Sequence, residues 1–214
     1  MNDRAIHVLK LGGSLLDLPD LLEKFERWRS GKGGPGAGGR CKDADLLVVG
    51  GGRVADLVRD FHQSHPLEIP VGHDLCVRAM QFNTFLLAAK LTDATIVERP
   101  DQCDAVWSAG RLAVVDPIAW LEYQERQFDI AIPRRWSFTS DSIAAHLATR
   151  LGASALSLLK STLPDEPCDL ERAAELKLVD GDFPKAASSI GWVELVNLRA
   201  AQMPGCVLKG APES

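Results

Sequence analysis

The chain has 214 residues, a length that suits one fairly large α/β domain with a sizeable core. Hydrophobic residues make up 46% and charged residues 25%, which is ordinary for a globular protein. The formal net charge of −5 argues against a nucleic-acid-binding protein, which would more often be basic. It does not exclude a phosphorylated metabolite as ligand, because such binding depends on local fields.

The sequence contains no segment that indicates a membrane or an export route. No apolar run approaches the roughly 18 residues of a membrane span, and the N-terminus lacks the layout of a signal peptide. The five cysteines are odd in number and widely scattered, which does not suit a disulfide framework. We therefore expect free thiols and a cytoplasmic protein with no membrane partner.

The hydrophobic pattern predicts alternating strands and helices. Short apolar runs favour buried strands, and apolar residues at helical spacing favour amphipathic helices. This alternation implies an α/β sandwich with a mostly parallel sheet, which we take as a single domain over residues 1–214. In chain order we expect strands at 5–11, 44–52, 94–98, 154–160 and 191–198, helices at 19–29, 53–63, 73–91, 117–126 and 137–153, short helices at 169–176 and 183–190, and one or two short extended pieces within 105–117.

Residues 30–42 form a glycine-rich segment, "SGKGGPGAGGRCK", that cannot pack as regular structure. It does not fit the spacing G-x-x-x-x-G-K-[ST], so it is not a phosphate-binding loop of that type. The interpretation we favour is a surface connector, whose length costs little. A lid is the alternative.

The stretch "VLKLGGSLL" ends a predicted strand with Lys10, Gly12, Gly13 and Ser14. A lysine inside a sheet is costly unless it reaches an anion or the solvent. The two glycines allow backbone N–H groups to approach a ligand closely, and the serine adds a hydroxyl donor. The stretch predicts a phosphate-binding turn. A strand followed by a plain tight turn is the alternative.

A second glycine turn, "VVGGGRVAD", joins the next strand to a helix at Gly51, Gly52 and Arg53. Helix N-termini favour anions, and an arginine can bind a phosphate or carboxylate through two parallel hydrogen bonds. The spacing also fits the dinucleotide fingerprint G-x-G-x-x-A. That alternative needs a strand about 20 residues later that ends in an acid, and the sequence has none there.

The stretch "FTSDSIAAHLATRLGASALSLLK" contains Asp141 in the first turn of a helix and Lys160 at the end of the next strand. A carboxylate is favoured at a helix N-terminus, and on its own Asp141 could be no more than that. Together with Lys10, however, the two residues form a group of charged side chains that suits phosphoryl transfer. The two ammonium groups would neutralise a moving phosphoryl group while the aspartate orients them.

In order and approximate spacing, these three stretches resemble the amino acid kinase family, also called the aspartokinase superfamily. The resemblance spans about three quarters of the chain. It implies a three-layer α/β/α sandwich, with an acceptor side at about 1–130 and an ATP side at about 131–214. It further implies ATP as phosphoryl donor, Mg²⁺ carried mainly on the ATP phosphates rather than at a protein metal site, and a dimer or larger homo-oligomer.

By position, the resemblance assigns roles to the residues of the three stretches. Lys10 would contact the transferred phosphoryl group, and Asp141 would be the organising aspartate. Gly12, Gly13 and Ser14 would bind the phosphoryl group. Gly51 and Gly52 would face a small acceptor that carries a phosphate or a carboxylate.

Within this family, the short length and "TSDSIAAHLATRLGA" resemble the small branch of the archaeal aminomethylfuran phosphate kinase. That branch implies transfer onto a phosphate monoester in methanofuran-type biosynthesis. The chain departs from larger members after Lys160, where "KSTLPDEPCD" stands, and it has no recognisable late glycine-rich segment. Lys160 or Lys185 could replace the further lysine of that segment. A nucleotide-binding or regulatory protein that has lost catalysis is therefore the alternative function.

Histidines near the second glycine turn allow two interpretations. His62 and His65 with His73 and Cys76 could be drawn as a zinc site, but the intervening prolines and the need to pack a helix face argue against it. His73 lies where an acceptor would bind, and a protonated imidazole would suit an anion. We therefore include His73 among the acceptor-binding residues, with a helix-capping or solvent-exposed histidine as the alternative.

Overall fold

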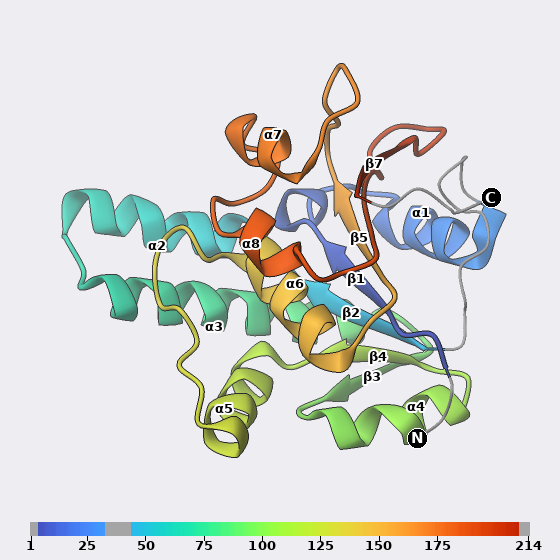
Figure 1. The fold of residues 1–214 in the computed structure, drawn as a ribbon, viewed down its shortest axis with the longest axis horizontal. Helices are drawn as coiled ribbons and strands as arrows, with labels where there is room; N and C mark the ends of the chain where they lie inside the picture. The colour runs from blue at the N-terminus through green and yellow to red at the C-terminus, as the bar shows by residue number, and fades with distance from the viewer. Residues whose placement is uncertain (1–3, 33–43, 210–214) are drawn as a thin grey trace.

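The computed structural model describes residues 4–32 and 44–209, and the strands in these ranges form one seven-stranded sheet (Figure 1). The strand order is β3-β4-β2-β1-β5-β6-β7. All neighbouring pairs are parallel except β6 and β7, so the prediction of a mostly parallel sheet is confirmed. The strands are β1 (His7–Leu11), β2 (Asp45–Val49), β3 (Ala94–Val97), β4 (Leu112–Val115), β5 (Ala155–Lys160), β6 (Trp192–Asn197) and β7 (Gly205–Lys209).

The helices cover both faces of this sheet, and α2 and α3 project beyond it as an antiparallel pair (Figure 1). Short helical turns occur at η1 (Gly13–Leu15), η2 (Trp28–Lys32) and η4 (Pro100–Gln102). The α-helices are α1 (Leu21–Arg27), α2 (Gly52–Ser64), α3 (Ile69–Ala88), α4 (Cys103–Ser108), α5 (Pro117–Phe128), α6 (Ser140–Leu151), α7 (Leu170–Glu175) and α8 (Phe183–Ala187).

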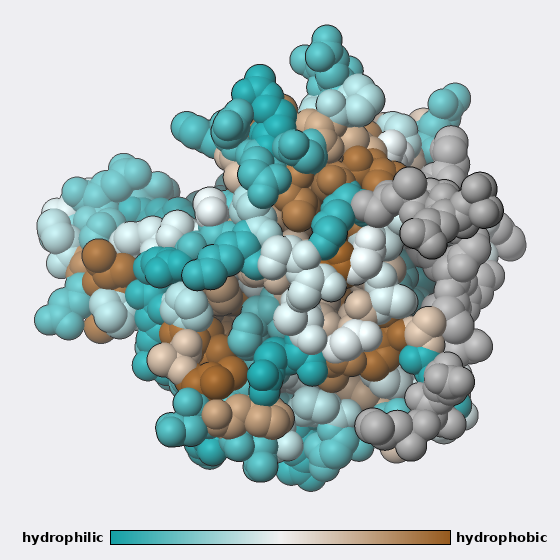
Figure 2. Space-filling view, viewed as in Figure 1, coloured by the Kyte–Doolittle hydropathy of each residue, from teal (hydrophilic) through white to brown (hydrophobic). Residues whose placement is uncertain are grey.

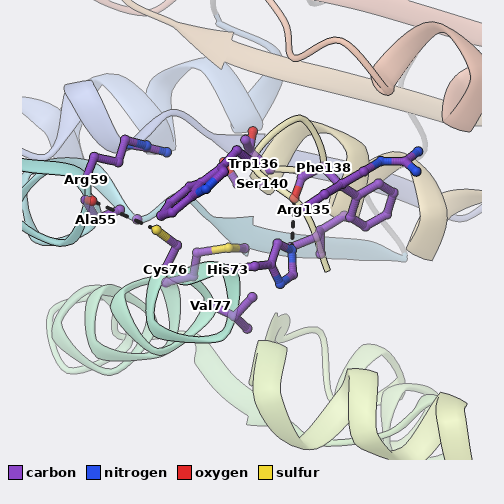
Figure 3. Close-up of a pocket in the computed structure, with 13 residues that line it drawn as sticks. Ala55, Arg59, His73, Cys76, Val77, Arg135, Trp136, Phe138 and Ser140 are labelled. Atoms are coloured by element: carbon purple, nitrogen blue, oxygen red, sulfur yellow. Dashed lines mark hydrogen bonds between the residues drawn. The ribbon is translucent and has the colours of Figure 1, made fainter. Parts of the chain in front are cut away.

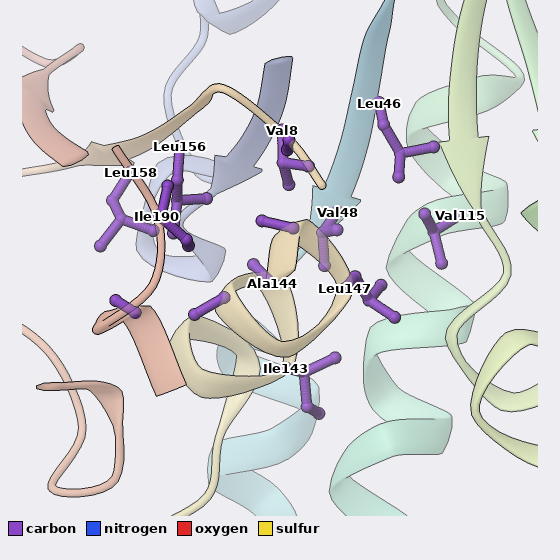
Figure 4. Close-up of a cluster of buried hydrophobic side chains, with 14 of the residues drawn as sticks. Val8, Leu46, Val48, Val115, Ile143, Ala144, Leu147, Leu156, Leu158 and Ile190 are labelled. Carbon is purple, nitrogen blue, oxygen red and sulfur yellow. The ribbon is translucent and has the colours of Figure 1, made fainter. Parts of the chain in front are cut away.

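Two hydrophobic cores form because successive strand side chains point to opposite faces. On one face, Val8 and Leu158 pack with Ile143 and Leu147 of α6 (Figure 4). On the other face, the alternate residues of the same strands pack against α1. The sheet is therefore the middle of three layers, as the sequence predicts.

Three segments differ from the sequence-based predictions. Residues 103–108 form helix α4 rather than an extended piece, because Cys103, Val106 and Trp107 are spaced to bury one helical face. Helix α3 begins at Ile69, with a proline in the first turn where no backbone donor is needed. Strand β7 was not predicted, because its residues alternate only weakly in burial.

The prediction of a loop at 30–42 falls mostly on residues 33–42, which lie outside the described ranges. Residues 30–32 continue the helical turn η2. Within the described ranges, none of the helices has the length and apolar character needed to cross a membrane.

Apolar side chains are exposed on the projecting α2–α3 pair, where Figure 2 shows a patch at the left of the molecule. On α3, five of these positions and an arginine are separated alternately by four and three residues. That spacing places side chains in one seam along a helix. We call this seam the α3 stripe; it comprises Val71, Leu75, Arg78, Phe82, Phe85 and Ala89.

Candidate functional site

The carboxyl ends of β1, β2 and β5 meet at one edge of the sheet, beside the first turn of α6. In the sheet order, β2 and β5 flank β1 on opposite sides. The direction of chain progression therefore reverses at β1, and such a reversal opens a crevice beyond the strand ends. All three sequence stretches with unusual strand ends lie here.

Lys10 and Lys160 point to the same face of the sheet, toward α6. Residues two apart on a strand point to the same face of the sheet. Lys10 therefore points to the same face as Val8, and Lys160 to the same face as Leu156 and Leu158. These three apolar residues pack in the core under α6. The Lys10 ammonium lies 2.9 Å from Asp141 Oδ1, and the Lys160 ammonium donates to Asp141 Oδ2 at 2.7 Å. One carboxylate thus holds two ammonium groups from neighbouring strands.

Burial and charge act against each other at this cluster. Burial favours the neutral acid, but Lys10 and then Lys160 outweigh it and lower the pKa of Asp141 to about 2. Burial also lowers the pKa of Lys160 to about 8, although Asp141 acts in the opposite direction. The cluster carries two positive charges and one negative charge near neutral pH, which leaves a net cation at the bottom of the crevice.

The two glycine turns pack backbone against backbone, so neither turn tolerates a side chain. A Cβ on Gly13 would lie 2.1 Å from the Gly52 nitrogen, and Gly52 adopts a positive φ of 50°. Gly12 donates its N–H to the Leu159 carbonyl at 2.8 Å, which joins the first turn to β5. These contacts fix the position of both turns relative to the lysines.

Asn83 is a buried residue of α3 that holds the second glycine turn and that sequence reasoning missed. Its side-chain amide donates to the Gly50 and Gly51 carbonyls, each at 2.8 Å. Because both carbonyls accept these hydrogen bonds, the second glycine turn is held in one conformation. Asn83 stands at helical spacing from the buried residues Met80 and Leu87, and a polar residue on that face was the available sequence signal.

An open cleft of about 720 Å³ lies over both turns. Its arginines are Arg53, Arg59 and Arg199. Arg59 pairs with Asp56 and Arg199 pairs with Asp17, whereas Arg53 has no acid partner among the described residues. Arg53 is therefore available to an anionic ligand. The cleft is lined by Gly13, Ser14, Leu16, Asp17, Gly51, Gly52, Arg53, Val54, Ala55, Asp56, Arg59, Asn83, Ser140, Ser161, Thr162 and Arg199.

A smaller, mainly apolar pocket adjoins this cleft (Figure 3). Gly51, Ala55, Arg59 and Ser140 line both, so the two spaces are continuous. Trp136 forms one wall, packed so closely on α3 that a Cβ on Gly72 would lie 2.4 Å from its ring. We call this space the tryptophan pocket; Cys76, Val77, Met80, Phe138 and Ile143 supply the rest of its apolar lining.

Asp180 caps the N-terminus of α6 from a distant part of the chain and was also missed from the sequence. Its carboxylate accepts from the Thr139 and Ser142 backbone N–H groups, each at 3.0 Å, and from both hydroxyl groups. This satisfies helix-terminal donors that would otherwise lack partners. The cap holds the turn that carries Asp141. No local motif could identify it, because the partners are far apart in sequence.

His73 is buried, and its Nε2 lies 3.0 Å from the Phe138 carbonyl oxygen. The side chain lines the tryptophan pocket together with Gly51 of the second glycine turn, but it does not line the cleft that contains Arg53. In the described ranges, no group of three or more His, Cys, Asp or Glu residues is arranged to hold a metal ion. The histidines drawn as a zinc site instead make separate contacts, as when His62 Nδ1 accepts from Leu67 N–H.

Comparisons with known proteins identify the fold. No protein-family model matches the sequence, and no curated protein matches it. Solved structures do match over nearly the whole chain. The UMP kinase from Ureaplasma parvum is 14% identical with a TM-score of 0.60, and the match covers 94% of this chain and 92% of that one.

Two further structures agree with this match. The aspartate kinase from Synechocystis is 17% identical with a TM-score of 0.61, over 98% of this chain. The chain spans 41% of the length of that protein. The UMP kinase from Bacillus anthracis is 12% identical with a TM-score of 0.60, over 92% of this chain and 89% of that one. The fold expected from the amino acid kinase resemblance is therefore confirmed.

Proposed function

We propose that the protein is an ATP-dependent small-molecule kinase, which transfers the γ-phosphoryl group to a phosphate or carboxylate oxygen. The observation that carries this proposal is the pair of lysines held on Asp141 at the bottom of a glycine-lined cleft. Phosphoryl transfer depends mainly on positioning and on neutralising the charge of the phosphoryl oxygens. The shared fold with UMP kinases and an aspartate kinase supports the same conclusion.

In this proposal the charged cluster stabilises the transition state. Lys10 and Lys160 neutralise the transferring group, and Asp141 keeps both ammonium groups aimed and limits their repulsion. Gly12 and Gly13 offer backbone N–H groups. Ser14 adds a hydroxyl, which in the free protein donates to Ser161 at 3.2 Å.

The acceptor is proposed to bind on the side of the second glycine turn, within residues 1–130. Gly51 and Gly52 allow close approach, and Arg53 would bind the acceptor anion. His73 would contribute through the tryptophan pocket, which its side chain borders.

ATP is proposed to bind on the side of residues 131–214, where Ser161 and Thr162 follow β5 along the cleft. Both oxygens of Asp141 contact lysines, and among the described residues no group of three or more His, Cys, Asp or Glu side chains is arranged to hold a metal ion. The donor set therefore fits a Mg²⁺ ion carried on the ATP phosphates rather than one held by protein ligands. When bound, the ion would neutralise phosphate charge alongside the lysines.

The tryptophan pocket supports a finer proposal for the acceptor. An apolar pocket with an aromatic wall, continuous with an anion-binding cleft, suits an acceptor with a small ring at one end and an anion at the other. Aminomethylfuran phosphate has this form, which agrees with the resemblance to the small family branch. We accordingly propose a role in one-carbon cofactor biosynthesis of the methanofuran type, in the cytoplasm.

The alternative is a catalytically inactive, nucleotide-binding or regulatory protein of the same fold. The sequence that follows Lys160, "KSTLPDEPCD", favours this alternative, because it replaces the loop of larger members. Such a protein would bind ATP but would show no turnover with any acceptor.

We also propose that the chain forms a homo-oligomer through the α3 stripe. Val71, Phe82 and Phe85 are 46%, 54% and 51% exposed. An exposed seam of mainly apolar residues is typical of an interface rather than of a free surface. Its 3-4 spacing suits packing against the same helix of a second copy.

A combined binding and turnover experiment tests the kinase proposal. Thermal stability is measured with Mg-ATP, and ADP release is measured with a panel of phosphate and carboxylate acceptors. We expect Mg-ATP to stabilise the wild type, and Lys10→Met to lower kcat far more than it raises KM. Lys90→Met, at an exposed lysine outside the cleft, is the matched control. ATP binding without any ADP release would support the inactive alternative, and absence of binding would reject both.

A further inference from the structure

A second hollow, separate from the cleft and from the charged cluster, lies between α3 and α5 and has a cavity volume of about 80 Å³. We call it the α3–α5 pocket. Its apolar wall consists of Val77 of α3, Ile118 and Leu121 of α5, and Ile132. Charged groups of both signs stand around this wall. The pocket therefore combines an apolar surface with anions and cations, unlike the tryptophan pocket.

His73 lines this pocket and has a buried ring nitrogen without a hydrogen-bond partner among the described residues. A carbonyl oxygen can only accept, so Nε2 donates to Phe138, and in the neutral form of the ring the single proton is on Nε2. Nδ1 is then a lone-pair acceptor, and it is buried without a hydrogen-bond partner. Asp74 Oδ1, at 3.6 Å, is itself an acceptor and cannot satisfy it. In Figure 3 this nitrogen points away from Phe138. A buried acceptor of this kind calls for a donor.

The charged groups at the rim divide into occupied and available ones. Arg134 bridges Asp74 at 3.2 Å and Glu125 at 2.9 Å, so these three neutralise one another in part. Glu122 pairs with Arg126 outside the pocket. Arg78, in contrast, has no acid partner among the described residues although it lines the pocket. Arg78, which also belongs to the α3 stripe, is thus the rim cation without a counter-charge in the part of the chain that the structure describes.

We propose that the α3–α5 pocket binds a small zwitterion with an apolar side chain, that is, a ligand of the amino acid type. Arg78 receives its carboxylate. The ammonium group donates to His73 Nδ1 and lies near the carboxylates of Glu122 and Glu125. The apolar side chain covers Val77, Leu121 and Ile132. This pocket shares no residue with the cleft, although His73 and Val77 also line the tryptophan pocket.

Isothermal titration with three related probes tests the proposal without ATP or turnover. L-leucine carries both charges, L-leucinamide lacks the carboxylate, and 4-methylpentanoate lacks the ammonium group. We expect L-leucine to bind at least about ten-fold more tightly than either analogue, because each analogue leaves one buried or charged partner unpaired. Equal binding of the three probes, or no binding of L-leucine, would overturn the proposal.

Two variants assign the binding to named groups. Arg78→Met is expected to remove the preference for L-leucine over L-leucinamide. His73→Gln retains a donor for the Phe138 carbonyl but removes the Nδ1 acceptor, and it is expected to reduce the preference over 4-methylpentanoate. Arg172→Met, at an exposed arginine of α7, is the matched control and should leave all three affinities unchanged.

Arg53→Met distinguishes binding in this pocket from binding in the cleft, since a carboxylate could also bind at Arg53. We expect this variant to leave the affinity for L-leucine unchanged. Loss of L-leucine binding in Arg53→Met but not in Arg78→Met would assign the ligand to the cleft and would overturn the proposal. None of these outcomes depends on the kinase proposal, which is tested by ATP binding and ADP release.

Discussion

The Lys10 ammonium and the Asp141 carboxylate lie 2.9 Å apart, and both side chains are almost fully buried. Lys10 comes from the central strand β1, and Asp141 from the first turn of α6. A buried ion pair gains little net stability, because desolvation offsets the attraction. The pair is better explained by a role in function. Asp141 holds the buried ammonium group of Lys160 close to that of Lys10.

Asp141→Asn removes the negative charge but keeps the shape of the side chain. We expect the free energy of unfolding to fall by about 3 kcal/mol or more, because two buried ammonium groups then lack a counter-charge. We also expect kcat to fall roughly a hundred-fold, since the lysines are no longer oriented. Urea unfolding and ADP release measure the two effects. Asp104→Asn, in the first turn of α4 and outside the cleft, is the control and should change neither.

The pKa of Lys160, lowered to about 8 by burial, predicts opposite pH trends for activity and for stability. The proposed role needs the ammonium form, so kcat/KM should fall as pH rises through about 8. The unfolded chain keeps the ordinary pKa of 10.5 and binds more protons between about 8 and 10.5. The contribution of Lys160 to stability therefore rises with pH across that window.

Lys160→Arg tests this assignment, because a guanidinium stays protonated throughout the range. The alkaline fall in kcat/KM should then disappear or move well above pH 8. If Lys160→Arg is active but retains a fall near pH 8, another group is responsible for it.

Gly52→Ala is expected to disrupt the site rather than merely strain the backbone. Its Cβ would lie 2.7 Å from the Gly13 carbonyl oxygen, so the two glycine turns would have to separate. Gly110→Ala is the matched control, because Gly110 also has a positive φ but has nothing within 4 Å of a Cβ. We expect Gly110→Ala to cost about 1–2 kcal/mol of stability and no activity. Gly52→Ala should cost more stability and should abolish Mg-ATP turnover.

Phe82→Glu tests the proposed oligomer, because it places a charge in the middle of the α3 stripe. We expect the wild type to elute as a dimer or larger assembly in size-exclusion chromatography with light scattering, and the variant to shift to the monomer. Leu176→Glu changes another exposed apolar residue, at the end of α7, and should leave the assembly unchanged. A monomeric wild type would contradict the proposal.

Some features of the fold followed directly from local patterns in the sequence. The apolar runs that end at Leu11, Val49 and Lys160 predicted three parallel strands, because each is short, buried and followed by a break in the pattern. The short helices after Asp169 and Asp182 were predicted in the same way. Helix α4 was predicted wrongly, because a six-residue helix contains too few turns to show its period.

The sequence alone determined which residue types stand at the strand ends: two lysines, two glycine turns and a helix-terminal aspartate. Only the tertiary structure decided that Lys10 and Lys160 share a carboxylate and that Asn83 and Asp180 hold the turns around them. It also decided that the His73 ring bonds to the Phe138 carbonyl and leaves one nitrogen unsatisfied. The reason is physical. Periodicity and turn chemistry depend on neighbours in the chain, whereas these contacts join residues from distant segments, which the packing of helices on the sheet brings together.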